Sequence, residues 1–560
     1  MSSKISRRKF IKNSSLATAG ILFGCSVRPV FDVLIKNGQI ADGLLARTFA
    51  GDIGVIGEKI AAIGNLGNAS ANLTIDAIGK VVSPGFIDIH SHTDTELLVD
   101  PKAESKIHQG VTTEVSGNCG YAPFPLTDAD QQEFDQESFQ QYGLHINWKD
   151  IDGFLNELEK SKFSLNYITL TGHGKLRSFV MGKNDLAPTM DQLNKMKQHL
   201  AQTLEAGSFG LSTGLEYAPG SYAKTDELIE LSKVAAKYDG IYATHLRNED
   251  DTVEEAVEEA LQICREAQVS LQISHLKVCN KNNWHKIDHV LDMVHRASEA
   301  GHPVHADRYP YNAWSTGISS LLPLWSRQGN TDEIIARLDV PELVPDIRTY
   351  AEGRGNRIGG WDRLIINSCY SDENKIFEGK SISECLELTG LSPFEFIKKM
   401  MIEERGRVTI TGFAMDEANL HKVLSSPLVM IGSDGSAVSP DGKLSHGKPH
   451  PRYYGTFPRV LGKYCREDKL FDIAIAVQKM SSMPADKLGL KYRGKLAKEY
   501  FADIVIFNPD TVIDKATFSN PHQFPVGIQY VFVNGKMVIN EGKHTGKHPG
   551  KILRKNSIPV

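Results

Sequence analysis

The sequence predicts an α/β protein, a TIM (β/α)8 barrel with a small β domain formed from both chain ends and an inserted subdomain. Three observations predict this fold. Apolar strand-like segments alternate with amphipathic helical segments through the middle of the chain, short strands with tight turns occur at both ends, and a long segment precedes the last predicted barrel strand. Alternating strands and helices are typical of a parallel sheet, and eight such units are typical of a closed barrel.

Short strands at both ends of the chain predict the β domain. They alternate apolar and polar residues between Asn-Gly and single-Gly turns, over residues 32–38, 52–57, 59–64, 502–507 and 530–538. Neither end alone has enough strands for a core. We therefore assign residues 31–84 and 485–545 to one small β domain.

Eight segments between these ends have the length and apolar character of barrel strands. They are residues 81–90, 111–116, 165–171, 208–213, 240–245, 270–275, 303–309 and 428–433. Amphipathic helical stretches over residues 190–206, 225–238 and 252–267 lie between several of them. The last two predicted strands are separated by far more residues than a loop requires. We therefore place an inserted subdomain near 320–400, within a barrel domain of residues 85–484.

Composition narrows the classes of partner. The chain carries 63 Lys and Arg against 68 Asp and Glu, a net charge of −5, without a basic run. This excludes a typical nucleic-acid-binding surface and leaves a small-molecule substrate as the expected partner. The seven cysteines form no C-x-x-C pair and no dense disulfide pattern.

The N-terminus predicts export. Residues 6–12 (SRRKFIK) resemble a twin-arginine motif, and the apolar stretch at 16–23 is too short to span a bilayer. Residues 22–25 (LFGC) resemble a bacterial lipobox with Cys25 as the lipidated residue; a plain signal peptide with an incidental cysteine is the alternative. We expect a signal over residues 1–25 and an exported bacterial protein, periplasmic or a membrane-anchored lipoprotein, which touches the membrane only through Cys25.

The segment SPGFIDIHSH (residues 83–92) carries the first chemical signal. His90 and His92 follow an apolar strand, at the end of a barrel strand where active sites lie. Residues two apart in an extended segment point to the same side, so both imidazoles can reach one cation. Alone, this pair could equally be two solvent-facing histidines.

Four further residues occur at the same end of other predicted strands. They are Cys119, His245, His275 and Asp434. Their convergence predicts a metal site, and a thiolate with imidazoles is the donor set of zinc. Asp434 lies between glycine and serine neighbours that leave space for water, so we assign it as the general base.

The chain resembles the D-aminoacylase (N-acyl-D-amino-acid deacylase) family of the amidohydrolase superfamily over residues 31–545. The matching motifs are PGFIDIHSH (84–92), GNCG (117–120), STGLEYAPG (212–220), YPYNA (309–313) and HPRYYGTFPR (450–459). The resemblance implies zinc-dependent hydrolysis of the amide bond of N-acyl-D-amino acids, giving a D-amino acid and a carboxylate.

The resemblance also implies roles for individual residues. Cys119, His245 and His275 would hold one tight zinc, whereas His90, His92 and Asp434 would form a second position that is weak or vacant. Cys119 would replace the carboxylated lysine that bridges two metals in many relatives. Asp434 would take a proton from the attacking water and pass it to the departing amine. Four residues would bind substrate: Lys277, Tyr309, Ser315 and Arg452.

Three alternatives stay open at this stage. The chain could be a dipeptidase acting on peptides with a C-terminal D-residue, or a cyclic-amide hydrolase of the dihydroorotase or hydantoinase kind. It could also be a non-catalytic binding protein on a decayed barrel, although no expected ligand is missing. The sequence leaves the side-chain and acyl-group preferences undecided: an acidic D-residue would need an extra basic group in the pocket, an apolar one Leu, Phe or Met.

Overall fold

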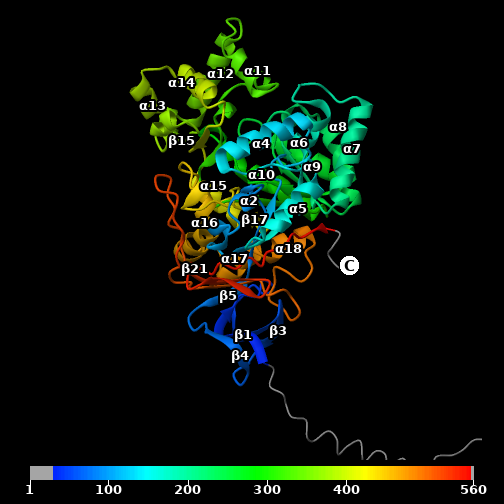
Figure 1. Ribbon diagram of the computed structural model, residues 1–560, viewed down its shortest axis with the longest axis vertical. Helices are drawn as coiled ribbons and strands as arrows, with labels where there is room; N and C mark the ends of the chain where they lie inside the picture. Colours follow the sequence, from blue (N-terminus) through cyan, green and yellow to red (C-terminus); the bar gives the residue numbers. More distant parts are fainter. Residues whose placement is uncertain (1–29, 556–560) are drawn as a thin grey trace, which may run out of the picture.

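The structure, a computed structural model, describes residues 30–555, so the predicted export signal and Cys25 lie outside the described residues. Within this range, eight parallel strand positions form a barrel whose neighbours follow chain order (Figure 1). They are β6 (Phe86–Asp88), β7 (Val111–Ser116), β8 (Asn166–Thr169) continued by β9 (Thr171–Gly172), β10 (Gly210–Gly214), β11 (Ile241–His245), β12 (Ser270–Ile273), β13 (Val304–Arg308) and β17 (Val429–Ile431). The predicted barrel is confirmed.

The barrel closes between its first and last strands, just beyond their carboxyl ends. The backbone N–H of Asp434 donates to the carbonyl of His90 at 2.8 Å, and Ser91 forms a parallel bridge with Gly435. This closure places the chain after β6 directly beside the chain after β17.

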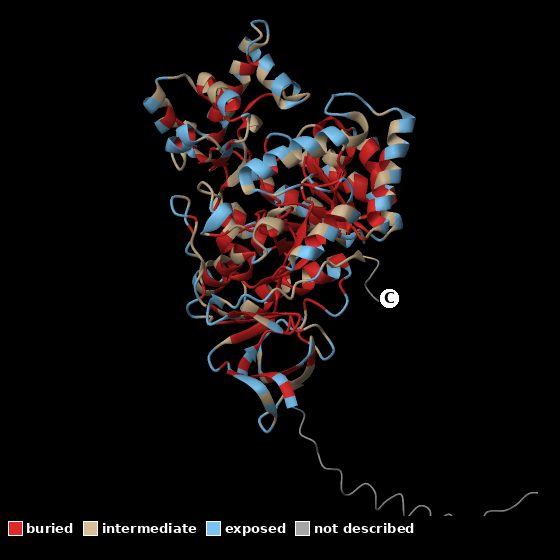
Figure 2. Cartoon of the chain, viewed as in Figure 1, coloured by how far each residue is buried: buried red, intermediate tan, exposed pale blue. Residues whose placement is uncertain are grey.

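Helices cover the outside of the barrel, with their apolar faces turned inward (Figure 2). In α9, for example, Val253, Val257, Ala260 and Cys264 are buried, while intervening glutamates face solvent. The outer helices are α4 (Asp128–Tyr142), α5 (Ile151–Ser161), α6 (His173–Met181), α7 (Met190–Glu205), α8 (Thr225–Lys237), α9 (Val253–Ala267), α10 (Ile287–Glu299), α15 (Glu417–Ser425), α16 (Arg452–Arg459), α17 (Ile473–Met480) and α18 (Ser482–Leu488). Two short helices, α2 (Glu96–Val99) and α3 (Glu104–Ile107), follow β6.

Strands from both chain ends form one sheet at the end of the molecule where β1, β3, β4 and β5 are labelled in Figure 1. They are β1 (Val30–Ile40), β2 (Phe49–Ile56), β3 (Lys59–Gly64), β4 (Ser70–Asp76), β5 (Val81–Pro84), β18 (Ile504–Phe507), β19 (Ile528–Val533), β20 (Lys536–Asn540) and β21 (Lys543–His544). The antiparallel pairing of β18 with β5 joins the two ends. Each end therefore completes the core of the other.

The predicted single strand over residues 81–90 was wrong, because the chain breaks at Gly85 into β5 and β6. β5 pairs with the sheet of the small domain, whereas β6 pairs with β7 of the barrel. A Cβ at Gly85 would lie 2.1 Å from Oγ1 of Thr112. Glycine thus allows the close backbone approach at which the chain passes from one sheet to the other.

The chain leaves the barrel after β13 and forms a separate unit at the opposite end from the β domain (Figure 1). A three-stranded sheet of order β14-β16-β15 and four helices share their own apolar core. The elements are β14 (Trp314–Gly317), α11 (Thr331–Arg337), α12 (Val344–Ile358), β15 (Leu364–Ser368), α13 (Ile382–Thr389), α14 (Pro393–Glu403) and β16 (Thr409–Gly412). No helix within residues 30–555 is both long enough and apolar enough to cross a bilayer.

Candidate active site

The six predicted metal-site residues all lie at the carboxyl end of the barrel, each delivered by the end of a strand. His90 and His92 follow β6, Cys119 follows β7, His245 ends β11, His275 follows β12 and Asp434 follows β17. Parallel strands bring these chain positions together although they are hundreds of residues apart.

Four of these residues form one compact cluster. The ligand atoms of His90, Cys119, His275 and Asp434 all lie within 4.8 Å of one another. Cys119 Sγ is 3.4 Å from Nε2 of His90 and 3.5 Å from Nε2 of His275. His92 is adjacent, with its Nε2 3.0 Å from Oδ1 of Asp434. The thiolate of Cys119 therefore lies between two histidines, one that follows the first barrel strand and one that follows the sixth.

Three cluster residues have left-handed backbone conformations. The φ angles are 52° at Cys119, 37° at His275 and 50° at Asp434. Side-chain-bearing residues rarely adopt this region, and such strain is concentrated at functional sites. The turns after the strands thus hold these side chains in place at a conformational cost.

Two buried carboxylates orient the imidazoles. Oδ1 of Asp307 lies 3.0 Å from Nδ1 of His90, and Oε1 of Glu249 lies 3.0 Å from Nδ1 of His275. In each ring the other nitrogen, Nε2, faces Cys119. A carboxylate behind a histidine is the usual way to fix the tautomer of a metal ligand.

His245 lies beside this cluster with both ring nitrogens buried and without a hydrogen-bond partner among the described residues. Its ring centroid is 4.5 Å from that of His275, and its Nε2 is 3.6 Å from Glu216 and 3.8 Å from Glu249. Unpartnered buried polar atoms are costly, and a metal ligand would have this arrangement.

Two histidines beside the cluster, His92 and His245, lie in surroundings that favour positive charge. Burial disfavours the protonated form, but a hydrogen bond to Asp434 and the charge of Cys119 raise the pKa of His92 to about 9. Against the same effect of burial, Glu249 and Cys119 raise the pKa of His245 to about 10. A divalent cation bound by these imidazoles would supply the same positive charge.

The anionic members of the cluster stay ionised for the same reason. Burial opposes ionisation of Cys119, but the charges of His90 and His275 hold its pKa well below the usual range. Burial likewise opposes ionisation of Asp434, but Arg452 and His275 hold its pKa well below the usual range. A thiolate, imidazoles and a carboxylate together fit a zinc-type ion.

The four predicted substrate-binding residues line the same cavity, which has a volume of about 670 Å³. The cavity also reaches His92, Cys119, His245, His275 and Asp434. Tyr309 is fully buried, with a hydroxyl that has no partner among the described residues. Ser315 accepts a hydrogen bond from Nδ2 of Asn367 at 2.9 Å. The structure thus brings all ten predicted site residues into one region.

The two predicted basic residues are each paired with a carboxylate. Nη1 of Arg452 lies 2.8 Å from Oδ2 of Asp434. Nζ of Lys277 lies 2.5 Å from Oε1 of Glu249 and 2.8 Å from Nδ1 of His275. A lysine or arginine with a carboxylate partner is often an exposed ion pair on the surface. These two pairs are not, because all four side chains are almost fully buried.

Asp307 and Glu249 are the functional candidates that sequence reasoning missed. A signal existed for each, because Asp307 falls inside the seventh predicted strand and Glu249 follows His245 by four residues. A charged residue inside a buried strand needs a partner. Which partner it has depends on the neighbouring strand, which the sequence does not reveal.

A buried charge network supports the closing seam of the barrel. Nζ of Lys106 donates to Oδ2 of Asp88 at 2.7 Å, to Oγ of Ser433 at 2.8 Å and to the carbonyl of Gly435 at 2.7 Å. Lys106 and Asp88 are fully buried. One ammonium therefore holds the residues on both sides of Asp434, Ser433 by its hydroxyl and Gly435 by its carbonyl.

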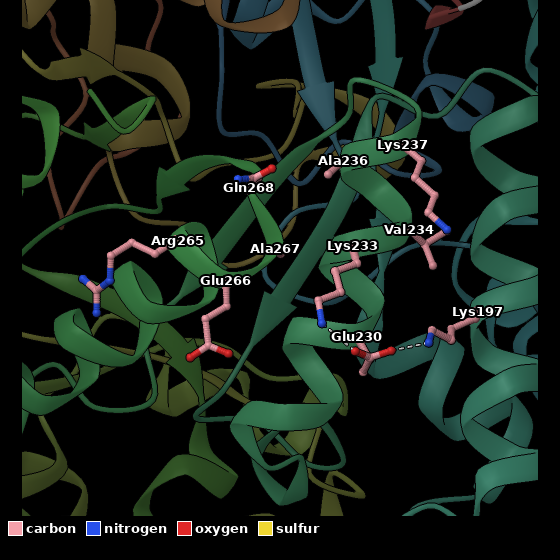
Figure 3. A pocket seen from close by; sticks show the side chains of 10 residues that line it. All are labelled: Lys197, Glu230, Lys233, Val234, Ala236, Lys237, Arg265, Glu266, Ala267 and Gln268. Atoms are coloured by element: carbon pink, nitrogen blue, oxygen red, sulfur yellow. Dashed lines mark hydrogen bonds and ion pairs between the residues drawn. The ribbon is translucent and has the colours of Figure 1, made fainter. Parts of the chain in front are cut away.

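A second hollow, of about 520 Å³, lies on the outside of α7, α8 and α9 (Figure 3). Three of its charges pair with one another: Glu230 pairs with Lys197 and, at 2.8 Å, with Lys233. These lysines lower the pKa of Glu230 to about 2. The hollow contains none of the predicted site residues.

A barrel that presents a thiolate, imidazoles and a carboxylate around one point defines a metal-dependent hydrolase. The chain belongs to the amidohydrolase family, whose model matches residues 73–313 and 379–539. It is 34% identical to the D-aminoacylase of Alcaligenes xylosoxydans xylosoxydans, over 94% of this chain and 98% of the relative. Identity to the N-acyl-D-glutamate deacylase of that organism is also 34%, over 94% and 97%.

A solved structure gives the same result. The N-acyl-D-glutamate deacylase of Bordetella bronchiseptica, complexed with zinc and a phosphonate inhibitor, is similar at a TM-score of 0.79 and 33% identity, covering 94% of this chain and 100% of that chain. The predicted resemblance to the D-aminoacylase family is confirmed.

Proposed function

We propose that this protein hydrolyses the amide bond of N-acyl-D-amino acids, releasing a D-amino acid and a carboxylate. The observation that carries the proposal is the shared cavity, in which the thiolate–histidine–carboxylate cluster meets two buried basic residues, Lys277 and Arg452. The two relatives that match nearly the whole chain are named as enzymes that act on this substrate class.

We assign the metal ligands on the same basis. Cys119, His245 and His275 would hold one tightly bound zinc, and His90, His92 and Asp434 would offer a second, weaker position. The ring nitrogens of His245, unpartnered among residues 30–555, and the contact of Cys119 with His275 support the tight position. The contact of Cys119 with His90 puts the thiolate beside the second position as well. When bound, zinc supplies Lewis-acid chemistry that polarises the amide carbonyl and makes water more acidic.

Asp434 carries the proton in the proposed reaction. Its carboxylate is ionised, lines the cavity and is held by its neighbours, as a general base requires. It takes a proton from the water whose oxygen attacks the carbonyl carbon. As the C–N bond breaks, Asp434 returns that proton to the amine nitrogen.

The remaining cavity residues bind and orient substrate. Arg452 and Lys277 would receive the α-carboxylate, since a guanidinium makes paired hydrogen bonds with a carboxylate and an ammonium supplies a point charge. The free hydroxyl of Tyr309 and Ser315 would complete this contact. Holding the α-carboxylate fixes the scissile amide relative to Asp434.

A substrate panel tests the function. The zinc-loaded protein is assayed for release of free amine from N-acetyl-D- and N-acetyl-L-amino acids with acidic, polar, apolar and basic side chains. We expect turnover of D-substrates and much slower turnover of their L-enantiomers. Absence of amine release from every D-substrate would overturn the proposal.

Two related activities are outcomes of the same panel. Faster hydrolysis of dipeptides with a C-terminal D-residue would make the protein a dipeptidase, and ring opening of a hydantoin would make it a cyclic-amide hydrolase. We favour the linear N-acyl amide because Cys119 occupies the cluster, in the place of the bridging carboxylated lysine that cyclic-amide hydrolases usually carry.

We further propose export through the N-terminal segment, with Cys25 as the site of a lipid anchor. The basis is the SRRKFIK and LFGC motifs. Fractionation of bacteria that express the full chain, beside Arg7→Lys/Arg8→Lys and Cys25→Ala variants, tests both parts. We expect the first variant to stay in the cytoplasm and the second to leave the membrane fraction for the periplasm; unchanged fractions would refute the respective part.

A further inference from the structure

The part of the cavity that the inserted unit lines carries positive charge. The segment after β14 contributes Arg327, and α12 contributes Arg354, both in the cavity wall. Tyr350 and Leu324 flank them. This region therefore differs from the part of the cavity beside the metal-type cluster, where Lys277 and Arg452 are each paired with a carboxylate.

The partners of these cations show which one is uncompensated. Lys277 is paired with Glu249, and Nη1 of Arg354 lies 2.7 Å from Oδ2 of Asp250. Arg327 instead donates from Nε and Nη1 to the main-chain carbonyls of Leu322 and Glu216, at 2.9 and 3.3 Å. No carboxylate within residues 30–555 forms an ion pair with its guanidinium.

The carboxylate of Glu216 acts on Arg327 through its charge but forms no ion pair with it. Glu216 also lines the cavity, but its Oε2 is 3.6 Å from Nε2 of His245, on the side of the metal-type cluster. Burial lowers the pKa of Arg327; the charges of Tyr350 and Glu216 oppose this effect, and the charge of Arg354 adds to it. A half-buried guanidinium beside another guanidinium, without an ion-pair partner among residues 30–555, is a favourable site for an anion, to which it would donate hydrogen bonds.

The surrounding chain fixes the position of Arg327. Nη1 of Arg337 donates to the carbonyls of Ser326 and Gln328, at 3.0 and 2.5 Å, on either side of it. The carbonyl of Lys183, in the loop after α6, accepts from the N–H of Gly329 at 3.0 Å. The loop that carries Arg327 into the cavity wall is thus held from two elements, unlike the backbone of a free surface arginine.

We propose that Arg327 receives a second carboxylate of the substrate, carried by the side chain of the D-residue, so that acidic N-acyl-D-amino acids are preferred. This inference rests on the proposed function and names its substrate class. The relatives do not decide the point, because a D-aminoacylase and an N-acyl-D-glutamate deacylase are equally similar to the chain.

Matched substrates test the proposal. We expect kcat/KM for N-acetyl-D-glutamate to exceed that for N-acetyl-D-glutamine, which has the same shape without the charge, by about 10- to 100-fold. N-Acetyl-D-leucine is the apolar comparison. N-Succinyl-D-leucine carries its second carboxylate on the acyl group, so a gain there that equals the gain for D-glutamate would overturn the side-chain assignment.

Variants then locate the effect. Arg327→Gln should remove most of the preference for D-glutamate while kcat/KM for D-glutamine changes by less than about threefold. Arg327→Lys, which keeps the charge, should retain part of the preference. Arg348→Gln is the matched control, because Arg348 lies on α12 but pairs with Glu395 at 2.6 Å outside the cavity; we expect no change.

The outcomes separate this inference from the proposed function. Equal or faster hydrolysis of the neutral D-substrates would overturn the role of Arg327 and leave the function standing. An equal loss on all substrates in Arg327→Gln would make Arg327 structural and also overturn it. If the wild-type protein hydrolyses no N-acyl-D-amino acid, both proposals fail.

Discussion

Nη1 of Arg452 lies 2.8 Å from Oδ2 of Asp434, and both side chains are buried in the wall of the same cavity. The residue expected to hold the substrate carboxylate thus also touches the proposed general base. Because Arg452 is the strongest charge that keeps Asp434 ionised, binding and proton transfer are linked at this contact. Substitutions at either residue should therefore affect more than one kinetic parameter.

Arg452→Gln should lower kcat as well as raise KM. The change removes a charged partner of the substrate and leaves Asp434 without its main counter-charge, and we expect kcat/KM to fall by about 100-fold. Steady-state kinetics with metal analysis checks this, since metal content should not change. A rise in KM alone would confine Arg452 to substrate binding.

Asp434→Ala should abolish most turnover while the tight zinc remains. Loss of a general base typically slows a reaction by about 10²- to 10⁴-fold. The measurement is kcat beside zinc content after dialysis. Retained activity would contradict the assignment of Asp434 as the base, and loss of all zinc would place Asp434 in the tight site instead.

Cys119→Ala should weaken metal binding, because the thiolate lies between His90 and His275. We expect zinc affinity to fall by at least about 10- to 100-fold, the effect of even an outer-shell partner. Metal competition with a chelator measures it. Cys264→Ala is the control, since Cys264 is buried in the core against Val269. In the native protein, Cys119 should react with an alkylating reagent only after metal removal; free reaction before removal would count against its role.

Lys106→Met should destabilise the fold, although Lys106 itself does not line the cavity. Removing the ammonium leaves Asp88 as a fully buried, unpaired carboxylate, which costs about 3–5 kcal/mol. Urea unfolding of the metal-loaded protein measures the loss. Lys102→Met, at a half-exposed ion pair with Glu104, should cost about 0.5 kcal/mol or less. Similar losses for both variants would show that the buried network contributes little.

The buried carboxylate of Glu227 gives a pH prediction. Burial raises its pKa, but His173 and Arg177 outweigh burial and hold it below the ordinary value of 4.5. A depressed folded-state pKa contributes stability above 4.5 that is lost as the pH falls through the folded value. Urea unfolding of wild type and Glu227→Gln at neutral pH and below pH 4.5 should show a stability difference that narrows on acidification. A constant difference would contradict the prediction.

Much of the site was predictable because each residue follows a recognisable strand. The motifs around His90, Cys119 and Arg452 mark positions that the barrel then brings to one end. Asp307 and Glu249 escaped prediction because a carboxylate behind a histidine depends on which strands are neighbours. The break at Gly85 escaped for a similar reason, since the close approach of Thr112 exists only in the folded chain.

The sequence by itself determined the barrel, the joining of the two chain ends and the set of residues around the cluster, because periodicity, turns and motifs are local properties. Only the tertiary structure decided how these residues pair. Arg452 contacts Asp434, Glu249 holds both His275 and Lys277, and Arg327 has no acidic partner among residues 30–555. All three facts depend on distances between segments that are far apart in the chain. The charge balance of the cavity, and with it the proposed preference for an acidic substrate, follows from those distances.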